Sequence, residues 1–389
     1  MVQLRPHQQR VLDENPDRAL LCHEGRTGKS LIGKYWSEHS SRNRAVLIIC
    51  IKKNKKMWTE LCPGARVVTK EEFKKDINSF TIPGALSGIV VDECHNFAGT
   101  LFIPKTRSQQ AADLYTCIKA NPEAHVLLLS ATPITNNPAS IHTLLCYLGR
   151  YIPWTDFRGA FYELKRMPYL PRPAYFPARD WREKADRLLQ KYADIVSLAD
   201  CVDSLPAVMP NEIIKVKTPV YEYEPEEERH WTIEHRHEQT LKYKVVKEMP
   251  HRKLIVVCHY TEQIDEMKAR LEKDRPTFVM DGRTKDPEGV ILAAQEASDC
   301  YFIVQAGMGE GWDGYMFGAM VFCSMPHRVL FHTQMRYRLT SVDYPKPALY
   351  YYLIGGAWDA KIYKSIMAGE DWNPHRASLS AMPTQYEPS

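Results

Sequence analysis

The feature that most constrains this chain is a short glycine-containing loop that joins an apolar run to a helix-forming segment. From Leu20 to Ser30 the sequence reads LLCHEGRTGKS, which predicts a strand, a turn and the start of a helix. Glycine at Gly25 and Gly28 lets backbone N–H groups face phosphate oxygens. Lys29 supplies a cation for the β and γ phosphates, and the hydroxyl of Ser30 suits magnesium. The loop therefore predicts a site for a nucleoside triphosphate at a helix N-terminus.

Two residues of this loop depart from common patterns. A strict G-x-x-x-x-G-K-[ST] match requires glycine at position 23, where the chain has His23. Arg26 follows the first glycine, and its charge lies close enough to the phosphates to assist binding or else folds outward. We include Arg26 and Thr27 among the expected nucleotide contacts. The alternative for the whole segment is an ordinary glycine-containing turn.

Composition favours a globular protein of two compact units. The chain has 389 residues, of which 44% are apolar and 25% charged, and no apolar run is long enough to span a membrane. Its first ten residues lack the apolar core of a signal peptide, so we expect a cytosol-like compartment. The ten cysteines have no paired spacing, which indicates reduced side chains in the core. A net charge of +4 does not by itself establish nucleic-acid binding.

Strand-length runs rich in Val, Ile and Leu recur in two series separated by helix-length segments. The first series covers 19–22, 45–51, 89–91 and 126–129, and the second covers 254–258, 278–280, 301–304, 319–322 and 349–354. This alternation predicts an α/β fold with two lobes, each a mainly parallel sheet flanked by helices. We expect the lobes over 1–150 and 213–372, a Pro- and aromatic-rich helical connector or insertion over 151–212, and a flexible tail over 373–389.

Two further strands are predicted to end in reactive side chains. Asp92 and Glu93 follow the run 89–91, at the edge where parallel sheets bind ligands. Asp92 would hold magnesium, while Glu93 would orient the water that attacks the γ phosphate. The alternative is a solvated acidic turn. The next strand runs into Ser130-Ala131-Thr132-Pro133.

In this order, the segments GRTGKS, DECH and SATP resemble motifs I, II and III of the superfamily 2 helicases and translocases. The opening Leu4-Arg5-Pro6-His7-Gln8 is similar to an element of the Swi/Snf-type, DEAD/DEAH-box-like branch, in which the glutamine contacts adenine. This resemblance implies that Arg5 and Gln8 help to bind ATP rather than any nucleoside triphosphate. A surface amide is the alternative for Gln8. The length of the chain suits a compact phage or bacterial member.

The second lobe continues the resemblance. Residues 309–313, GEGWD, are similar to motif V, which implies nucleotide contacts from Gly311 and Asp313. Residues 334–338, QMRYR, are similar to motif VI. The family pattern places a second arginine three residues after Arg338, but Ser341 stands there. The arginine finger must therefore be Arg336 or Arg338.

The resemblance implies two RecA-like lobes that bind ATP and Mg²⁺ and couple hydrolysis between the lobes to movement on nucleic acid. The coupling residues would be Ser130, Thr132 and Gln334. Phosphate contacts would come from Lys52 and Lys53 in a motif Ia-like segment and, more weakly, from two residues of the second lobe, Gln305 and Arg328. We expect a monomeric motor on DNA rather than RNA, acting as a helicase or a duplex translocase.

Three alternatives remain open at this stage. A nucleic-acid-binding scaffold with weak or no ATPase activity would account for Ser341, but it would not need the paired acids Asp92 and Glu93. An RNA-directed helicase would carry the same motifs. A P-loop kinase or GTPase has no place for SATP or for the arginines of a second lobe, and we rank it last.

Overall fold

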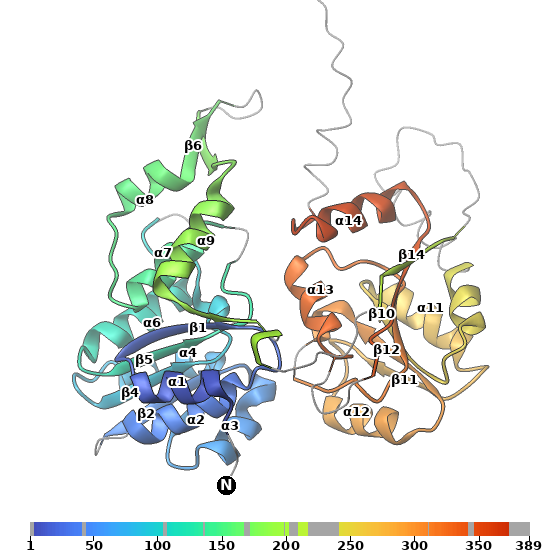
Figure 1. The fold of residues 1–389 in the computed structure, drawn as a ribbon, viewed down its shortest axis with the longest axis horizontal. Coiled ribbons are helices and arrows are strands. Elements are labelled where there is room, and N and C mark those ends of the chain that lie inside the picture. Colours follow the sequence, from blue (N-terminus) through green and yellow to red (C-terminus); the bar gives the residue numbers. More distant parts are fainter. Residues whose placement is uncertain are drawn as a thin grey trace, which may run out of the picture. The chain divides into compact units, whose positions relative to one another are not determined.

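The computed structural model describes residues 4–40, 44–103, 107–134, 137–166, 172–197, 199–201, 209–216, 241–309, 311–340 and 346–372. The chain divides into two compact units, Met1–Ser204 and Leu205–Ser389. Each unit is built on a six-stranded sheet (Figure 1). Among the described residues, no helix is long and apolar enough to cross a membrane. All ten cysteines are free, and nine of them are buried.

The sheet of the first unit is parallel throughout, with strand order β3-β2-β4-β5-β1-β8. Its strands are β1 (Arg18–His23), β2 (Ala45–Cys50), β3 (Arg66–Thr69), β4 (Leu86–Val91), β5 (His125–Leu129) and β8 (Asp194–Val196). Central strands such as β4 are buried along their whole length, because helices cover both faces. The continuous Val, Ile and Leu runs of the sequence reflect this two-sided burial.

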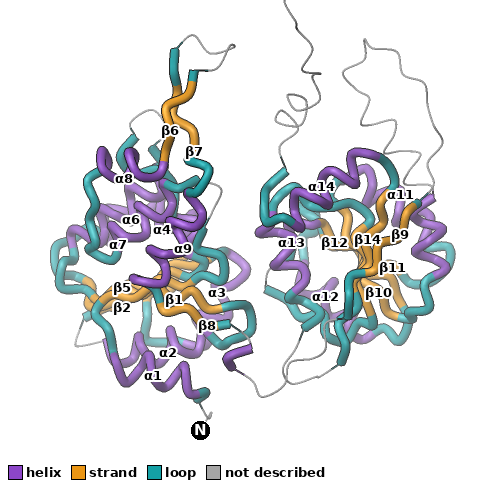
Figure 2. The backbone as a smooth tube through the Cα atoms, turned by 45° about the horizontal axis from the view of Figure 1, so that its top comes forward, coloured by secondary structure: helices purple, strands orange, loops and turns teal. Residues whose placement is uncertain are grey.

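Alternate side chains of these strands enter two separate cores. One core joins the sheet to α1 (Pro6–Glu14), α2 (Lys29–Ser40) and α3 (Lys55–Leu61), and the Trp36 and Trp58 side chains are fully buried there. The other joins the opposite face to α4 (Lys70–Lys75), α5 (Ile77–Phe80), α6 (Gln109–Ala120), α7 (Ala139–Tyr147), α8 (Trp154–Phe161) and α9 (Trp181–Tyr192). Figure 2 shows the sheet between these helical layers.

The region 151–212, which the sequence set apart as a connector, is shared between the two units. Helices α8 and α9 pack in the core of the first unit, and an antiparallel hairpin of β6 (Tyr162–Lys165) and β7 (Ala174–Pro177) projects between them. Helix α9 ends at Tyr192, because the chain becomes extended at Ala193 and pairs β8 with β1.

The second unit repeats the parallel arrangement with strand order β11-β12-β10-β13-β14-β9. Its strands are β9 (Glu212–Lys215), β10 (Lys253–Cys258), β11 (Thr277–Met280), β12 (Cys300–Gln305), β13 (Ala319–Phe322) and β14 (Tyr350–Ile354). Its helices are residues 241–248, α11 (Thr261–Leu271), α12 (Pro287–Glu296), α13 (Val329–Arg336) and α14 (Ala357–Met367). The predicted fold class, two mainly parallel sheets flanked by helices, is confirmed.

A buried ion pair fastens the helices of the second unit. The Lys242 ammonium pairs with the Asp359 carboxylate on α14, and the two side chains are only 1% and 2% exposed. The same ammonium donates to the carbonyl oxygen of Cys323 at 2.7 Å. The Asp359 carboxylate also accepts from the backbone N–H of Gly355 at 3.0 Å. The segment 241–248, α14 and the residue after β13 are therefore joined by one charged group.

Removing one partner of this pair should destabilise the second unit strongly. We expect Asp359→Ala to lower the free energy of unfolding by about 3–5 kcal/mol, because it leaves a buried ammonium without its counter-ion. The matched control Glu266→Ala removes a partly exposed pair with Arg270 on α11 and should cost less than about 0.5 kcal/mol. Urea denaturation followed by circular dichroism measures both values, and similar losses for the two variants would contradict this reading.

Candidate active site

The loops that carry the predicted chemistry meet at one edge of the first sheet. Strands β4, β5 and β1 are neighbours and parallel, so the residues that follow them lie at the same edge. These residues are Asp92 and Glu93 after β4, Ser130 after β5, and the loop 24–28 after β1. Strand β5 lies between β4 and β1, so the Asp92–Glu93 pair and the phosphate loop follow strands that are separated by one strand of the sheet.

The phosphate loop is closed around its own lysine. The Nζ atom of Lys29 donates to the carbonyl oxygens of His23 at 2.6 Å and Glu24 at 2.9 Å. The Thr27 hydroxyl donates to the same Glu24 carbonyl at 2.9 Å. Ser30 is the second residue of α2. Lys29 is thus held over the loop in which phosphates are expected.

The turn of this loop has an unusual backbone. Gly28 has a φ of +85°, which suits glycine, whereas Arg26 has a φ of +70° without being glycine. Gly25 precedes it and opens the turn. A non-glycine residue in this region costs about 1 kcal/mol or more, which the surrounding contacts must offset. Arg26, which departs from the common sequence pattern, therefore has a strained backbone conformation.

Helix α1 holds the loop from the outside. The Gln8 amide nitrogen donates to the carbonyl oxygens of Thr27 at 3.1 Å and Gly28 at 3.4 Å, and its oxygen accepts from the Arg5 backbone N–H at 2.8 Å. The Arg5 guanidinium donates to the Arg26 carbonyl at 3.3 Å. A Cβ on Gly28 would lie 2.2 Å from the Gln8 amide nitrogen, so a larger residue there would displace the Gln8 side chain. Contact between Gln8 and adenine stays a prediction.

His7 also contacts the loop, which the sequence did not indicate. One of its ring nitrogens, Nε2, lies 3.0 Å from the Thr27 carbonyl oxygen, and the other lies 3.5 Å from the Cys201 sulfur. Burial is the largest cause of a lowered His7 pKa. A neutral ring that donates from Nε2 to Thr27 fits this environment. The only signal in the sequence was the position of His7 inside the segment Leu4 to Gln8.

The histidine that replaces glycine in the loop has a structural partner. The Nε2 atom of His23 lies 3.1 Å from one carboxylate oxygen of Asp194 on β8, and the side chain is fully buried. Arg10 on α1 donates to the other oxygen of that carboxylate at 2.7 Å. Residue 23 therefore faces an acid on the neighbouring edge strand. This pairing explains the departure from the strict P-loop pattern.

Asp92 is buried and held by two donors. The Asn54 amide and the Trp58 indole donate to the same carboxylate oxygen, at 2.9 and 2.8 Å. Burial, followed by the charge of Glu93, raises the pKa of Asp92 to about 6 against the opposing effect of these bonds. Asn54 is a residue that the sequence reasoning missed, and its only signal was an amide inside the run Lys52 to Lys56.

A histidine joins motif II to motif III. Glu93 has a φ of +50°, and its carboxylate lies 3.3 Å from the Nδ1 atom of His95. The same ring nitrogen is 3.1 Å from the Ser130 hydroxyl, which accepts from the backbone N–H of Thr132 at 3.1 Å. The proposed water-orienting acid and the proposed coupling residues therefore form one connected group. His95 was missed as a site residue, although it is the last letter of DECH.

The donor set fits magnesium. Ser30 and Asp92 offer a hydroxyl and a carboxylate oxygen, the hard ligands that Mg²⁺ takes together with water and phosphate. Burial raises the pKa of Asp92, and a nearby cation would favour the charged form of its carboxylate. Among the described residues, no group of three or more His, Cys, Asp or Glu side chains could hold a metal. Mg²⁺ bound mainly through phosphate and water does not need such a group.

In the second unit, Arg338 fastens motif VI to motif V. Its guanidinium donates to the carbonyl oxygens of Trp312 at 2.6 Å and Gln334 at 3.2 Å. Gly311 has a φ of +73°, and the carbonyl oxygen of Asp313 accepts from Gln295 at 2.7 Å. The side chain of Arg338 is therefore engaged within its own unit, and Ser341 lies outside the described residues.

Arg336, the other candidate finger, packs on an aromatic ring. Its guanidinium carbon lies 4.4 Å from the centre of the Tyr350 ring. The Tyr350 hydroxyl donates to the Arg336 carbonyl oxygen at 2.7 Å. Tyr350 belongs to the buried core of this unit. These contacts give Arg336 a role in attaching the end of α13 to β14.

The predicted nucleic-acid contacts have different surroundings. Lys52 and Lys53 are exposed on a short 3-10 turn, Lys52–Asn54, that follows β2. The Gln305 amide oxygen accepts from the Gly282 backbone N–H at 3.0 Å. The Arg328 guanidinium lies 5.5 Å from the centre of the Phe331 ring. Lys52, Lys53 and Arg328 are exposed, whereas Gln305 is partly buried.

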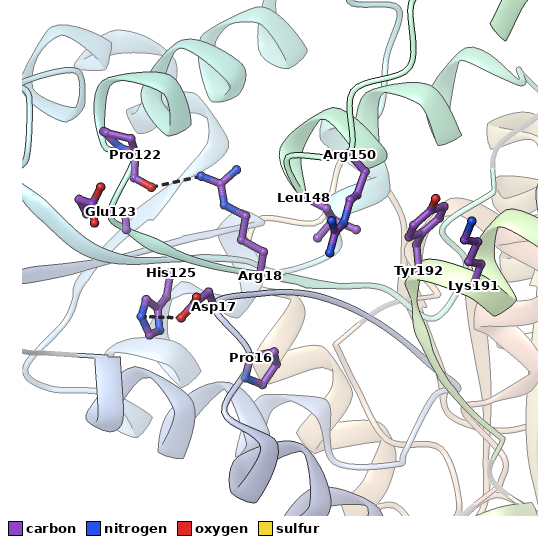
Figure 3. A pocket seen from close by; sticks show the side chains of 11 residues that line it. Pro16, Asp17, Arg18, Pro122, Glu123, His125, Leu148, Arg150, Lys191 and Tyr192 are labelled. Atoms are coloured by element: carbon purple, nitrogen blue, oxygen red, sulfur yellow. Dashed lines mark hydrogen bonds and ion pairs between the residues drawn. The ribbon is translucent and has the colours of Figure 1, made fainter.

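A polar hollow of about 770 Å³ lies away from this site. Arg18 and His125 line it, and they begin β1 and β5, so it opens at the opposite edge of the sheet (Figure 3). The Arg18 guanidinium donates to the carbonyl oxygens of Tyr147 and Pro122, and His125 lies 3.2 Å from Asp17. These polar groups tie loops together, and none of the predicted site residues lines the hollow.

No protein-family profile and no curated protein matches this chain. Among solved structures, a Dbp5 variant of S. cerevisiae bound to a Gle1 variant and IP6 is 11% identical and matches 95% of this chain and 87% of its own, with a TM-score of 0.57. The Hef helicase domain of Pyrococcus furiosus is 12% identical and matches 93% of this chain and 98% of its own, with a TM-score of 0.53. The Sulfolobus solfataricus SWI2/SNF2 ATPase core, in complex with dsDNA, is 12% identical and matches 94% of this chain and 91% of its own, with a TM-score of 0.42.

The likeness to Dbp5 and Hef extends over nearly the whole chain and concerns the fold. The two parallel sheets of this protein, each flanked by helices, correspond to the two RecA-like lobes of these structures. The chain therefore has the fold of the Dbp5 and Hef structures, two RecA-like lobes, which is the fold that the resemblance of its motifs implied.

Asp92 should lower the stability of the free protein at neutral pH. Its raised pKa means that the folded state binds a proton more tightly than the unfolded state between about pH 4 and 6. This carboxyl therefore contributes less stability as the pH rises through that window. We expect Asp92→Asn to stabilise the protein by on the order of 2 kcal/mol at pH 7.5 without metal, and by much less at pH 4.5.

Thermal melting in the presence of a chelator tests this expectation at both pH values. The matched control is Asp13→Asn on the exposed side of α1, where the amide can keep the bond to Gln9. That control should change stability by less than about 0.5 kcal/mol at either pH. A lower melting temperature for Asp92→Asn at pH 7.5 would show that burial does not penalise this carboxylate.

Proposed function

We propose that this protein is an ATP-dependent nucleic-acid motor, a DNA helicase or duplex-DNA translocase. The single observation that carries the proposal is the chain of contacts from Glu93 through His95 to Ser130. It connects the acid expected to orient water with a residue expected to couple hydrolysis to movement. A protein that only bound nucleotide would not need this connection.

Within the proposal, the residues of the first unit have distinct tasks. Lys29 exchanges its two carbonyl partners for phosphate oxygens, which are stronger partners because they carry charge. Ser30 and Asp92 hold Mg²⁺, which neutralises charge on the β and γ phosphates. Asn54 and Trp58 keep one oxygen of Asp92 fixed, so that the other can face the metal site. Glu93 orients the attacking water.

Coupling would depend on the contacts that His95 makes. A change at Glu93 on hydrolysis reaches the Ser130 hydroxyl through one ring, and Ser130 in turn fixes the backbone at Thr132. In the second unit, Arg338 would supply the arginine finger, with Gly311 and Asp313 in the adjacent loop. The Arg338 guanidinium contacts the backbone carbonyl of Gln334, and the coupling role of the Gln334 side chain stays a prediction.

The proposed track is DNA, contacted by Lys52, Lys53, Gln305 and Arg328. The DNA preference follows from the similarity of the segment Leu4 to Gln8 to the Swi/Snf-type branch. The exposure of Lys52 and Lys53 at the carboxyl end of β2 supports phosphate contacts there. An RNA track uses the same contacts, and the choice of polymer in the assay below decides between them.

One observation favours a second candidate, a nucleic-acid-binding scaffold with slow hydrolysis. The Arg338 guanidinium is bound to the carbonyl oxygens of Trp312 and Gln334. If it stays there when ATP binds, Arg338 does not reach the transferring phosphoryl group. The scaffold and the motor then differ in turnover and not in nucleotide affinity.

Hydrolysis of ATP by the purified protein tests the proposal. We expect turnover that is stimulated by duplex or single-stranded DNA more than by RNA and that requires Mg²⁺. Lys29→Ala and Glu93→Gln should each lower the stimulated kcat about 100-fold or more, because they remove a phosphate contact and the water-orienting acid. ATP binding without turnover above these variants would reject the motor and favour the scaffold.

Arg338 and Arg336 should differ in their effects. We expect Arg338→Ala to lower kcat about 1,000-fold while a nucleotide analogue still binds, since it removes charge from the transition state. Arg336→Ala should instead lower stability by about 1 kcal/mol through the lost contact with Tyr350, with less than about tenfold loss of kcat. Single-turnover kinetics and thermal melting of both variants measure this difference. The reverse pattern would assign the finger to Arg336.

A further inference from the structure

The β6–β7 hairpin exposes an apolar pair. Leu164 on β6 lies directly opposite Tyr175 on β7, so both side chains are on the same face of the ribbon. They are 58% and 47% exposed. The hairpin stands out beyond α8 and α9 in both views of the fold (Figures 1 and 2). A two-stranded ribbon gains no stability from apolar side chains left in water, which indicates a contact surface.

The same segment carries an excess of positive charge. Residues 158–182 contain six Lys and Arg against two acids. Both acids are already paired, Glu163 with Lys165 at 3.0 Å and Asp180 with Lys184 at 2.9 Å. The arginines of the hairpin are therefore not balanced by acids of the same segment, which favours an anionic partner.

Three arginines lie close to the exposed pair in space or in sequence. The Arg158 guanidinium lies 4.4 Å from the centre of the Tyr175 ring. Arg166 follows β6 and Arg172 precedes β7, and both are exposed. In the part of the chain that the structure describes, none of the three forms an ion pair. Because Tyr175 is 47% exposed, its ring keeps open surface beyond Arg158.

The root of the hairpin is fixed to the segment that follows motif III. The Tyr162 hydroxyl donates to the Asn137 side chain at 2.5 Å and accepts from the Ala139 backbone N–H at 3.1 Å. Beneath it, the rings of Phe157 and Phe161 stack at 4.2 Å. These contacts attach the base of the hairpin to Asn137 and Ala139, which follow the proposed coupling residues Ser130 and Thr132 in the sequence.

We propose that this face of the hairpin binds nucleic acid, with Tyr175 stacking on an unpaired base beside Leu164 and with Arg166 and Arg172 contacting phosphates. An aromatic platform flanked by cations is the chemistry that recognises single strands. Arginine also pairs with phosphate in a bidentate manner. An acidic peptide would match the charge but offers no flat base for the Tyr175 ring. The proposal rests on the proposed function, because it adds a strand contact to the same motor.

Fluorescence anisotropy with the full chain tests the proposal. The probes are labelled single-stranded DNA, forked duplex, blunt duplex and single-stranded RNA, each titrated at several salt concentrations. The variants are Tyr175→Ala, Tyr175→Phe and the double variant Arg166→Ala/Arg172→Ala. The matched control is Arg270→Ala, whose guanidinium lies 5.0 Å from the Tyr243 ring in the second unit. Thermal melting verifies that each variant folds.

We expect Tyr175→Ala to weaken binding to single strands and forks about fivefold or more, with a smaller effect on blunt duplex. Tyr175→Phe should keep the affinity, because the ring remains. The double arginine variant should lower the slope of log Kd against log salt by about 1 to 2, one for each lost phosphate contact. Arg270→Ala should stay within about twofold of the unaltered protein.

Unchanged affinity in Tyr175→Ala together with an unchanged salt slope in the arginine variant would overturn the proposal and leave the hairpin as a surface for another macromolecule. If the unaltered protein binds none of the four probes, the proposed motor function fails as well. The two failures are therefore distinguishable from one set of titrations.

Discussion

The chemistry of the first unit depends on the parallel pairing of four adjacent strands, β4, β5, β1 and β8. The ladder of hydrogen bonds continues past the strands into the site: the Ser130 N–H donates to the Leu21 carbonyl at 3.1 Å, and the Glu24 N–H donates to the Val196 carbonyl at 2.9 Å. Asp92 is fixed in the same way by the carbonyl of Ile49 at 2.9 Å on β2. Each reactive loop thus leaves the sheet in a defined direction, and a register shift in any strand would separate motifs I, II and III.

The site lowers the stability of the unit that carries it. Arg26 and Glu93 occupy the left-handed backbone region without being glycine, at a cost of about 1 kcal/mol or more each. Asp92 adds a buried carboxylate. These unfavourable features occur together where phosphate, metal and water are expected, and the two-sided burial of the sheet offsets them. Such concentration of strain is typical of functional sites, where ligands complete interactions that the free protein lacks.

The sequence predicted what short-range patterns encode. Apolar runs of three or four residues indicated the buried strands β1, β4 and β5. Because the loops after them carry the site residues, Lys29, Asp92 and Glu93 could be anticipated. The partners of these residues could not. Asn54 reaches Asp92 across 38 positions and His23 reaches Asp194 across 171, and no local pattern reports such pairs. Strand β8 was also missed, because three residues are too few to show a period.

In the second unit, the backbones of the motif V and motif VI segments are in close contact. A Cβ on Gly309 would lie 3.0 Å from the Met335 backbone nitrogen, and one on Gly314 would lie 3.1 Å from the Arg338 carbonyl oxygen. The Arg338 guanidinium adds its bond to Trp312. As an arginine finger, Arg338 must exchange that neutral carbonyl for a charged phosphate oxygen, which is the stronger partner. Losing the bond to Trp312 would remove one of the contacts that hold the loop containing Asp313. The same arginine would then link the state of the nucleotide to the conformation of motif V.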